Sequence, residues 1–439
     1  MSSIITNCWA LLLGMGLIML GNGLQGTLLG VRASLENFST TVIGLVMSGY
    51  FLGLIFGCNM VSKMVARVGH IRTFAALASL ASTSILVQAV FVDPLVWWAM
   101  RFITGFSYAG VYVVAESWLN EAAENNARGK LLSFYMLISL GGLAGGQLLL
   151  NLSSPSGFDL FVLTSLLISL AVIPILLSVT RAPQYEAMEN VSISQLFRVA
   201  PLGVFGMLLN GMMYGAIFSM GAVYATEAGM PVKDISFFMG AFVLGGFLFQ
   251  YPLGWMSDAF GRRRVIICCC VFGAGISFFA MDHATTGLPL LALVATIGGL
   301  TTPLYALCSV HTNDFLTPSQ MVAASGTLVL LSATGAALGS PLTAMAMDVF
   351  GPQSFYGSLG VMLSVVAVFA LYVYVRRASA KPEERSEFVI MTASPLTATL
   401  NPNIELEEIE LAHEESIEDI HASIEKLADT LAEDRQEAQ

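Results

Sequence analysis

Two charged side chains lie inside an apolar stretch of the chain, and they are the first candidates for chemistry. Residues 95–118 are otherwise uncharged, but they include Arg101 and Glu116. A charge in an apolar environment costs free energy, so such residues usually face a polar interior or a partner. Arg101 could bind an anionic group or adjust a proton-binding site, or it could be a structural arginine that donates to backbone carbonyls. Glu116 could exchange a proton, or it could belong to a charge network with basic residues.

In a helix over 95–118, the two charges would share one side. Fifteen residues at 100° per residue bring Glu116 to about 60° from Arg101 around the helix axis. At ~1.5 Å per residue, Arg101 lies roughly 10 Å from the nearer end of the stretch. Both side chains are therefore expected on broadly the same face.

Uncharged polar residues within other apolar stretches form a second set of candidates. Each could contact a bound solute, or could hydrogen-bond to a neighbouring helix, which is worth ~0.6 kcal/mol on average. The sequence shows no metal-ligand spacing among its histidines and cysteines and no Gly-x4-Gly-Lys-Ser/Thr phosphate loop. We therefore expect no metal, no cofactor and no enzymatic activity. The polar set is Asn22, Gln25, Gln147, Asn210, Tyr214 and Gln250.

The composition indicates which elements must position these residues. Of the 439 residues, 56% are hydrophobic and only 11% are charged, whereas soluble domains carry roughly 25% charged residues. Crossing ~30 Å of hydrocarbon takes ~20 apolar residues in a helix, because a segment in lipid must satisfy its own backbone hydrogen bonds. The sequence therefore predicts an all-α integral membrane protein. Its twelve expected spans are 4–30, 42–62, 73–92, 95–118, 131–151, 159–180, 199–226, 235–256, 265–282, 288–310, 320–347 and 354–375.

Basic residues gather in alternate loops and indicate the orientation, because Lys and Arg favour the cytoplasmic side. The opposite loops offer little beyond Arg32 and Lys233. We expect both termini in the cytoplasm and the chain in the inner (plasma) membrane of the cell. The basic set is Lys63, Arg67, Arg72, Arg128, Lys130, Arg181, Arg198, Arg262, Arg263 and Arg264, followed by Arg376, Arg377, Lys381 and Arg385.

Two landmarks recur at nearly one spacing and predict an internal repeat. Gly69, after the second span, and Gly261, after the eighth, lie 192 positions apart. A Gly-x3-Gly motif at 142–146 recurs at 335–339, which is 193 positions later. Such small residues allow close helix packing, and they could also form a hinge. The residues concerned are Gly142, Gly146, Gly335 and Gly339, with Pro341 as a break in the eleventh span.

The repeat predicts the domain organisation. A six-helix half at 1–180 and a second half at 199–376 would be joined by a cytoplasmic loop at 181–198 and followed by a tail at 377–439. Duplicated halves of this kind leave a cavity near the bilayer midplane, which can open to either side when the halves rock.

The loop after the eighth span resembles a family signature. Its sequence, Gly254-x3-Asp258-x2-Gly261-Arg262-Arg263, is similar to the loop signature of the major facilitator superfamily, which lies between the second and third helices of a half. In that family the loop latches the cytoplasmic side while the transporter faces outward. The resemblance implies the same role for these residues, beside their ordinary use as positive anchors.

The matching loop of the first half departs from the signature. It keeps Arg67, Gly69 and Arg72, but Ser62 and Ala66 stand in place of the Gly and the Asp. This half of the latch is therefore expected to be weaker or to be built otherwise. If Glu116 belongs to a cytoplasmic charge network, its expected partners are Arg67, Arg72 and Arg128.

The fourth span adds two further likenesses. Residues 101–110 read Arg-x2-Thr-Gly-x3-Ala-Gly and are similar to the fourth-helix pattern of the family. Glu121 and Arg128, in Glu-x6-Arg-Gly, resemble a loop signature of its sugar porters. Around them the chain looks most like the bacterial YcaD-type branch, through the segments 113–119, 128–132 and 145–149.

The resemblance covers residues 1–376 and implies a secondary transporter that moves a small solute by alternating access. Protons are the candidate coupling ion, and drug efflux and transport of organic anions or sugars both stay open. The expected partners are the solute, the coupling proton and membrane lipid. We expect a monomer and no nucleic-acid binding.

The acidic tail carries the whole net charge of −11, with 13 acidic and two basic residues in 405–439. An apolar stripe at three- and four-residue spacing predicts an amphipathic helix at 414–434 in an otherwise partly disordered segment. The tail offers an alternative function, a transporter-like sensor or scaffold that recruits a cytosolic partner of unknown identity.

Overall fold

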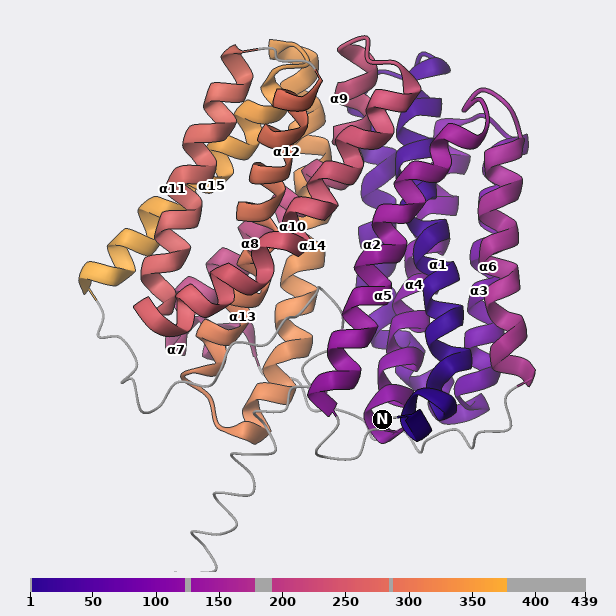
Figure 1. The fold of residues 1–439 in the computed structure, drawn as a ribbon, viewed down its shortest axis with the longest axis horizontal. Coiled ribbons are helices and arrows are strands. Elements are labelled where there is room, and N and C mark those ends of the chain that lie inside the picture. Colours follow the sequence, from indigo (N-terminus) through magenta and orange to yellow (C-terminus); the bar gives the residue numbers. More distant parts are fainter. Residues whose placement is uncertain (1, 123–127, 178–191, 284–286, 377–439) are drawn as a thin grey trace, which may run out of the picture.

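The computed structural model describes residues 2–122, 128–177, 192–283 and 287–376, and these form a bundle of long helices (Figure 1). The N-terminal half contains α1 (Ser2–Leu35), α2 (Thr40–Val68), α3 (His70–Val90), α4 (Pro94–Ala122), α5 (Arg128–Leu149), η2 (Leu150–Leu152) and α6 (Asp159–Leu177). The C-terminal half contains α7 (Ile193–Val199), α8 (Pro201–Gly215), η3 (Ala216–Met220), α9 (Gly221–Glu227), α10 (Val232–Phe260), α11 (Arg262–Asp282), α12 (Leu288–Thr301), α13 (Leu304–Asn313), α14 (Pro318–Phe350) and α15 (Ser354–Arg376).

The twelve predicted spans correspond to these helices. Within the described residues, eleven segments are long and apolar enough to cross a membrane. The twelfth span is α4, whose 29 residues include Arg101 and Glu116 and which packs between α2 and α3. The all-α, twelve-helix fold class is therefore confirmed. The predicted tail helix at 414–434 lies outside the described residues.

Several helices are longer than the predicted spans, because hydropathy detects only the part that lies in lipid. The second span was expected to end at residue 62 and the eighth at 256, but α2 continues to Val68 and α10 to Phe260. Each ends at a glycine with positive φ, Gly69 at 84° and Gly261 at 92°, a conformation that other residues adopt only with strain. The two turns between helices are thus built alike.

The Gly-x3-Gly motifs bring equivalent helices together in the two halves. A Cβ on Gly146 of α5 would lie 2.9 Å from the Cα of Gly23 in α1. A Cβ on Gly335 of α14 would lie 2.9 Å from the backbone nitrogen of Met212 in α8. Both distances are too short for a real contact. Close backbone packing therefore requires glycine in both places, and the pairing of α5 with α1 repeats as α14 with α8. The partners Gly142 and Gly339 crowd the same neighbouring helices.

Polar contacts join the two halves at one end of the bundle, which we call the closed end. This end carries Leu35, Thr40 and Phe350, and it lies opposite the terminal end, where Ser2 and Arg376 are found (Figure 1). The contacts between the halves are Thr40 Oγ1 to Glu227 at 2.7 Å, the Thr41 backbone nitrogen to Asp348 at 2.8 Å, and Asn151 Nδ2 to Ser236 Oγ at 2.6 Å.

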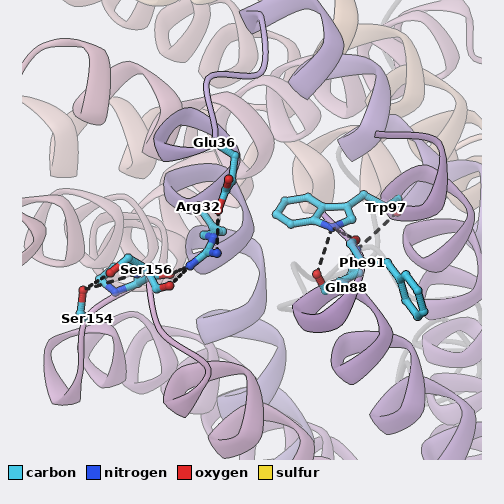
Figure 2. Close-up of polar contacts among 8 residues, drawn as sticks. Arg32, Glu36, Gln88, Phe91, Trp97, Ser154 and Ser156 are labelled. Atoms are coloured by element: carbon cyan, nitrogen blue, oxygen red, sulfur yellow. Dashed lines mark hydrogen bonds and ion pairs between the residues drawn. The ribbon is translucent and has the colours of Figure 1, made fainter. Parts of the chain in front are cut away.

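Turns at the closed end of the N-terminal half are fixed by side chains that donate to backbone carbonyls. Figure 2 shows Arg32, which pairs with Glu36 at 2.6 Å and donates to the carbonyl of Ser156. The same view shows the Trp97 indole, whose Nε1 donates to the carbonyls of Gln88 at 3.0 Å and Phe91 at 2.9 Å. These bonds hold α3 to α4 and α1 to the segment after η2.

Candidate solute-binding site

A cavity of about 110 Å³ lies between the two halves. That is far more than the ~10–15 Å³ that one water needs. Helices α1, α4 and α5 line it from the N-terminal half, and α8, η3, α10, α12, α13 and α14 line it from the other. Its polar lining residues are Asn22, Tyr112, Tyr135, Ser139, Asn210, Tyr214, Thr301, Thr302, Tyr305 and Ser332. None of the lining residues that the structure describes is charged.

The backbone departs from regular helix where the C-terminal half meets this cavity. Between α8 and α9 the chain forms a π-helical turn, η3, which supplies Ile217 and Phe218 to the lining. Between α12 and α13 it breaks at Thr302 and Pro303, and Thr301, Thr302 and Tyr305 line the cavity there. Irregular backbone at membrane depth is tolerated only in protein or beside a polar cavity, and it is a common feature of transporter binding sites.

Hydrogen bonds orient several polar groups of the wall. Asn22 Nδ2 donates to the Tyr112 hydroxyl at 3.4 Å, and this joins α1 to α4. Asn210 Nδ2 donates to the carbonyl of Thr301 at 2.9 Å, and this joins α8 to the end of α12. The Thr301 carbonyl belongs to the helix break, so Asn210 donates to a backbone acceptor that the break leaves without a helical partner.

A smaller cavity of about 40 Å³ adjoins the larger one on the side of the closed end. Arg101 is the one charged residue in the described part of its lining, and it is only 5% exposed. The guanidinium lies over the Tyr50 ring at 4.5 Å from the centroid. The two cavities are neighbours because they share four lining residues, Asn22, Leu143, Tyr214 and Phe218.

Glu116 lies on the same helix as Arg101, fifteen residues closer to the terminal end. It is completely buried, and its carboxylate accepts a hydrogen bond from the Tyr135 hydroxyl at 3.2 Å. Tyr135 lines the larger cavity, so the carboxylate connects to that cavity through one side chain. Among the described residues, no three His, Cys, Asp or Glu side chains are grouped to hold a metal ion.

The remaining predicted polar residues have different places. Gln147 lines the smaller cavity and accepts a hydrogen bond from Thr27. Gln25 is completely buried, and neither cavity includes it in its lining. Gln250 is buried in α10, also away from both linings. Tyr214 lines both cavities, and its ring packs on Phe218 with 4.4 Å between the centroids.

The family-like loop of the C-terminal half forms an ion-pair cluster in which Arg262 and Asp314 are buried and Asp258 is exposed. Arg262 Nε donates to Asp314 at 2.6 Å and its Nη1 lies 3.0 Å from Asp258. Arg263 lies over the Phe315 ring, 5.9 Å from its centroid. Gly254 is buried in α10 one turn before Asp258. These contacts tie together α10, α11 and the end of α13, all within one half.

In the N-terminal copy of that loop, Arg67 and Arg72 are exposed on either side of Gly69. The side chains of Glu121 and Arg128 lie outside the described residues, although their backbones belong to α4 and α5. Pro341 lies at the contact between the halves, where its Cα would be 3.1 Å from a Cβ on Gly44 of α2.

Tyrosines supply much of the wall, and sequence reasoning did not select most of them. Tyr112 follows Arg101 by eleven residues and so lies on the same helical face, which was a usable signal. Pro303 was a signal for the break in the tenth span. No local pattern marked Tyr135 or Tyr305, because their roles depend on which helices become neighbours.

Comparison with known proteins agrees with this architecture. The family model of the Major Facilitator Superfamily matches residues 11–237 and 203–404. The chain is 27% identical over 370 residues to the "Uncharacterized MFS-type transporter YcaD" of Escherichia fergusonii, covering 84% of this chain and 95% of that protein.

Solved structures show the same fold. The nucleoside transporter NupG superposes with a TM-score of 0.71 at 17% identity, covering 84% of this chain and 99% of that one. A D-xylose–proton symporter superposes with a TM-score of 0.66 at 15% identity, covering 86% and 99%. With the family model matching almost the whole membrane bundle, the chain belongs to the Major Facilitator Superfamily.

Proposed function

We propose that this protein is a secondary active transporter that binds a small solute in the larger cavity and releases it by alternating access. The observation that carries the proposal is the position of this cavity, which both halves line while polar contacts join them at the closed end. A solute held there would contact both halves, so its binding would be sensitive to their relative position.

The contacts at the closed end are suited to reversible opening. They are neutral or singly charged hydrogen bonds, each with a net contribution of about 0.5–3 kcal/mol. Water can replace them when the halves separate, so breaking them does not leave buried polar groups unpaired. A fully hydrophobic seal would be harder to open.

The positive-inside rule supports a cytoplasmic position for the terminal end, because the basic loops lie there. The closed end would then be external, so the described conformation would be closed on the external side. Glu116 is our candidate for the proton-coupling residue, because it is buried on the cytoplasmic side of the cavity and bonded to a cavity tyrosine. A carboxyl there could alternate between charged and neutral forms as the cavity alternates between exposure and closure.

Two-sided accessibility of the cavity tests the transport mechanism without knowledge of the solute. Ser139 lines the cavity on α5 and is half-buried. In a variant without native cysteines, Ser139→Cys should react with a membrane-impermeant maleimide in both right-side-out and inside-out vesicles. Leu137→Cys, two residues away and half exposed on the outer surface of the bundle, is the matched control and should react in neither.

A disulfide across the closed end makes the test decisive. Thr41→Cys with Asp348→Cys joins two residues that are hydrogen-bonded across the halves. The bridge should abolish labelling of Ser139→Cys from the external side and leave the cytoplasmic side unaffected. Labelling from a single side in the unbridged protein would refute alternating access and would favour a sensor with a fixed cavity.

A further inference from the structure

Arg101 is a buried cation whose described surroundings do not neutralise it. Among the described residues, its Nε and Nη1 atoms have no hydrogen-bond acceptor, and no carboxylate lies within 4.0 Å of the guanidinium. Glu116 is fifteen residues away along α4, which corresponds to about 22 Å. The smaller cavity therefore has a net positive charge beside unused donors.

The Tyr50 ring is an incomplete partner for this guanidinium. A cation over an aromatic face is attracted by the ring quadrupole, and more strongly when water is excluded. The ring face does not accept the N–H groups in the guanidinium plane, so their cost of burial persists. A buried charge without an acceptor costs more than the stacking returns. The site is therefore suited to a ligand that brings acceptors and negative charge.

The shared lining gives such a ligand a place for the rest of its body. A group bound at Arg101 would lie beside Tyr214 and Phe218, which continue into the larger cavity. That cavity is lined by aromatic rings and hydroxyl groups, and its described lining includes no charged residue. Two compartments, one cationic and one aromatic, fit a molecule with an anionic head and an apolar or aromatic body.

We propose that Arg101 forms an anion-binding subsite and that the solute of this transporter is a small organic anion. The inference rests on the proposed function, because it assigns the head and the body of the solute to the two adjoining cavities. Amines would be disfavoured, since a second cation beside Arg101 would have no compensating carboxylate in the lining.

Matched aromatic probes test the charge requirement directly. Benzoate, benzamide and benzylamine share a ring but differ in the charge of the head group. Binding would be measured by thermal shift on the full chain in phosphatidylcholine nanodiscs at constant ionic strength, so that no anionic lipid supplies the head group. Benzoate should bind at least about tenfold more tightly than either analogue, in line with the strength of charge-assisted hydrogen bonds.

Substitution of the arginine separates charge from shape. Arg101→Gln should remove the preference for benzoate, whereas Arg101→Lys should retain part of it. Arg264→Gln, at an exposed arginine outside both cavities, is the control and should bind benzoate like the wild type. Because the comparison of the three probes needs only wild-type protein, the charge requirement can be tested even if an Arg101 variant folds poorly.

Benzoate should also slow maleimide labelling of Ser139→Cys. This protection should be absent in the double variant that carries both Ser139→Cys and Arg101→Gln. Equal binding of benzoate and benzamide would overturn the anion subsite. So would failure of benzoate, benzenesulfonate and phenylphosphonate alike to bind the wild type. Two-sided labelling of Ser139→Cys requires no ligand. A failed anion subsite is therefore distinguishable from a failed transport mechanism.

Discussion

Gly44 in α2 is the position at which one added methyl group should shift the balance between the conformations. A Cβ at this position would collide with the Cβ of Ala344 and would lie 3.0 Å from the carbonyl oxygen of Ser340 and 3.1 Å from the Cα of Pro341. All three neighbours belong to α14, in the other half. The clash therefore exists only while the closed end is closed, and it disappears when α2 and α14 separate.

The expected size of the effect follows from the cost of overpacking. Adding a methyl group to a tightly packed contact costs typically 1–3 kcal/mol. Because every ~1.4 kcal/mol is a factor of ten, Gly44→Ala should favour opening of the closed end by about 5- to 140-fold. If about 1% of the wild-type molecules are open at this end, the variant would have roughly 5–60%.

Spin-label distance measurement reports the two populations. Leu35, at the end of α1, and Phe350, at the end of α14, are exposed on opposite halves at the closed end. Cysteines at these positions, labelled in a background without the native cysteines, should give mainly one short distance in the wild type. Gly44→Ala should add a longer component. The native residues to be replaced are Cys8, Cys58, Cys268, Cys269, Cys270 and Cys308.

Gly57, on the same helix, provides the matched control. A Cβ there would lie 2.6 Å from the Cβ of Ala109 and 2.8 Å from the carbonyl oxygen of Phe106, so the crowding is of the same kind. These neighbours belong to α4, in the same half, and stay in place during opening. Gly57→Ala should lower thermal stability without changing the distance distribution. An unchanged distribution in Gly44→Ala, or an equal change in both variants, would refute the reasoning.

Three further predictions concern stability and the tail. Arg262→Ala removes the ion pair with the 3%-exposed Asp314 carboxylate and should cost about 3–5 kcal/mol of unfolding free energy. Arg264→Ala, at an exposed arginine, should change the unfolding free energy by less than ~0.5 kcal/mol. Equal denaturation midpoints of the two variants would contradict this. Trp97→Phe removes the indole donor to two backbone carbonyls and should lower the free energy of unfolding by about 1–3 kcal/mol. The thermal midpoint should fall accordingly. An unchanged midpoint would show that other contacts hold the turn between α3 and α4. Removal of residues 385–439 should leave two-sided labelling of the cavity intact, and one-sided labelling that appears only after truncation would show that the conformational change depends on the tail.

The transmembrane architecture was predictable because lipid imposes a minimum length and an apolar composition on each span. Apolar stretches bounded by polar or Gly/Pro-marked breaks located all twelve helices. They did not show how far the helices extend, as at Val68 and Phe260, where the helix continues outside the lipid until a positive-φ glycine ends it. The paired glycines also predicted close packing correctly, since Gly146 and Gly335 leave room only for a neighbouring backbone.

The walls of the cavity were much less predictable, because side chains from eight helices and one π-helical turn meet there. Arg101 stood out as a charge in an apolar span, and the structure places it in the smaller cavity. The sequence pattern makes Gln25 a candidate on the same grounds as the other polar residues, but it lies outside the linings of both cavities. A single sequence does not tell which face of a uniformly apolar helix turns inward. Residues such as Tyr305 therefore became visible only with the tertiary structure.

The two halves contribute different properties to the candidate site. The charges come from α4 in the N-terminal half, a regular helix that packs on α2 through Gly53 and Gly105, where an added Cβ would meet the opposing backbone. The irregular backbone comes from the C-terminal half, at η3 and at the break before Pro303. Missing or displaced helical hydrogen bonds make such segments easier to bend than a regular helix. A solute bound between the halves would therefore have its anionic head fixed by a rigid wall, while the wall around its body can adapt. The energy of binding would then be spent mainly on reshaping the C-terminal half, which is the half whose position relative to α2 determines whether the closed end stays closed.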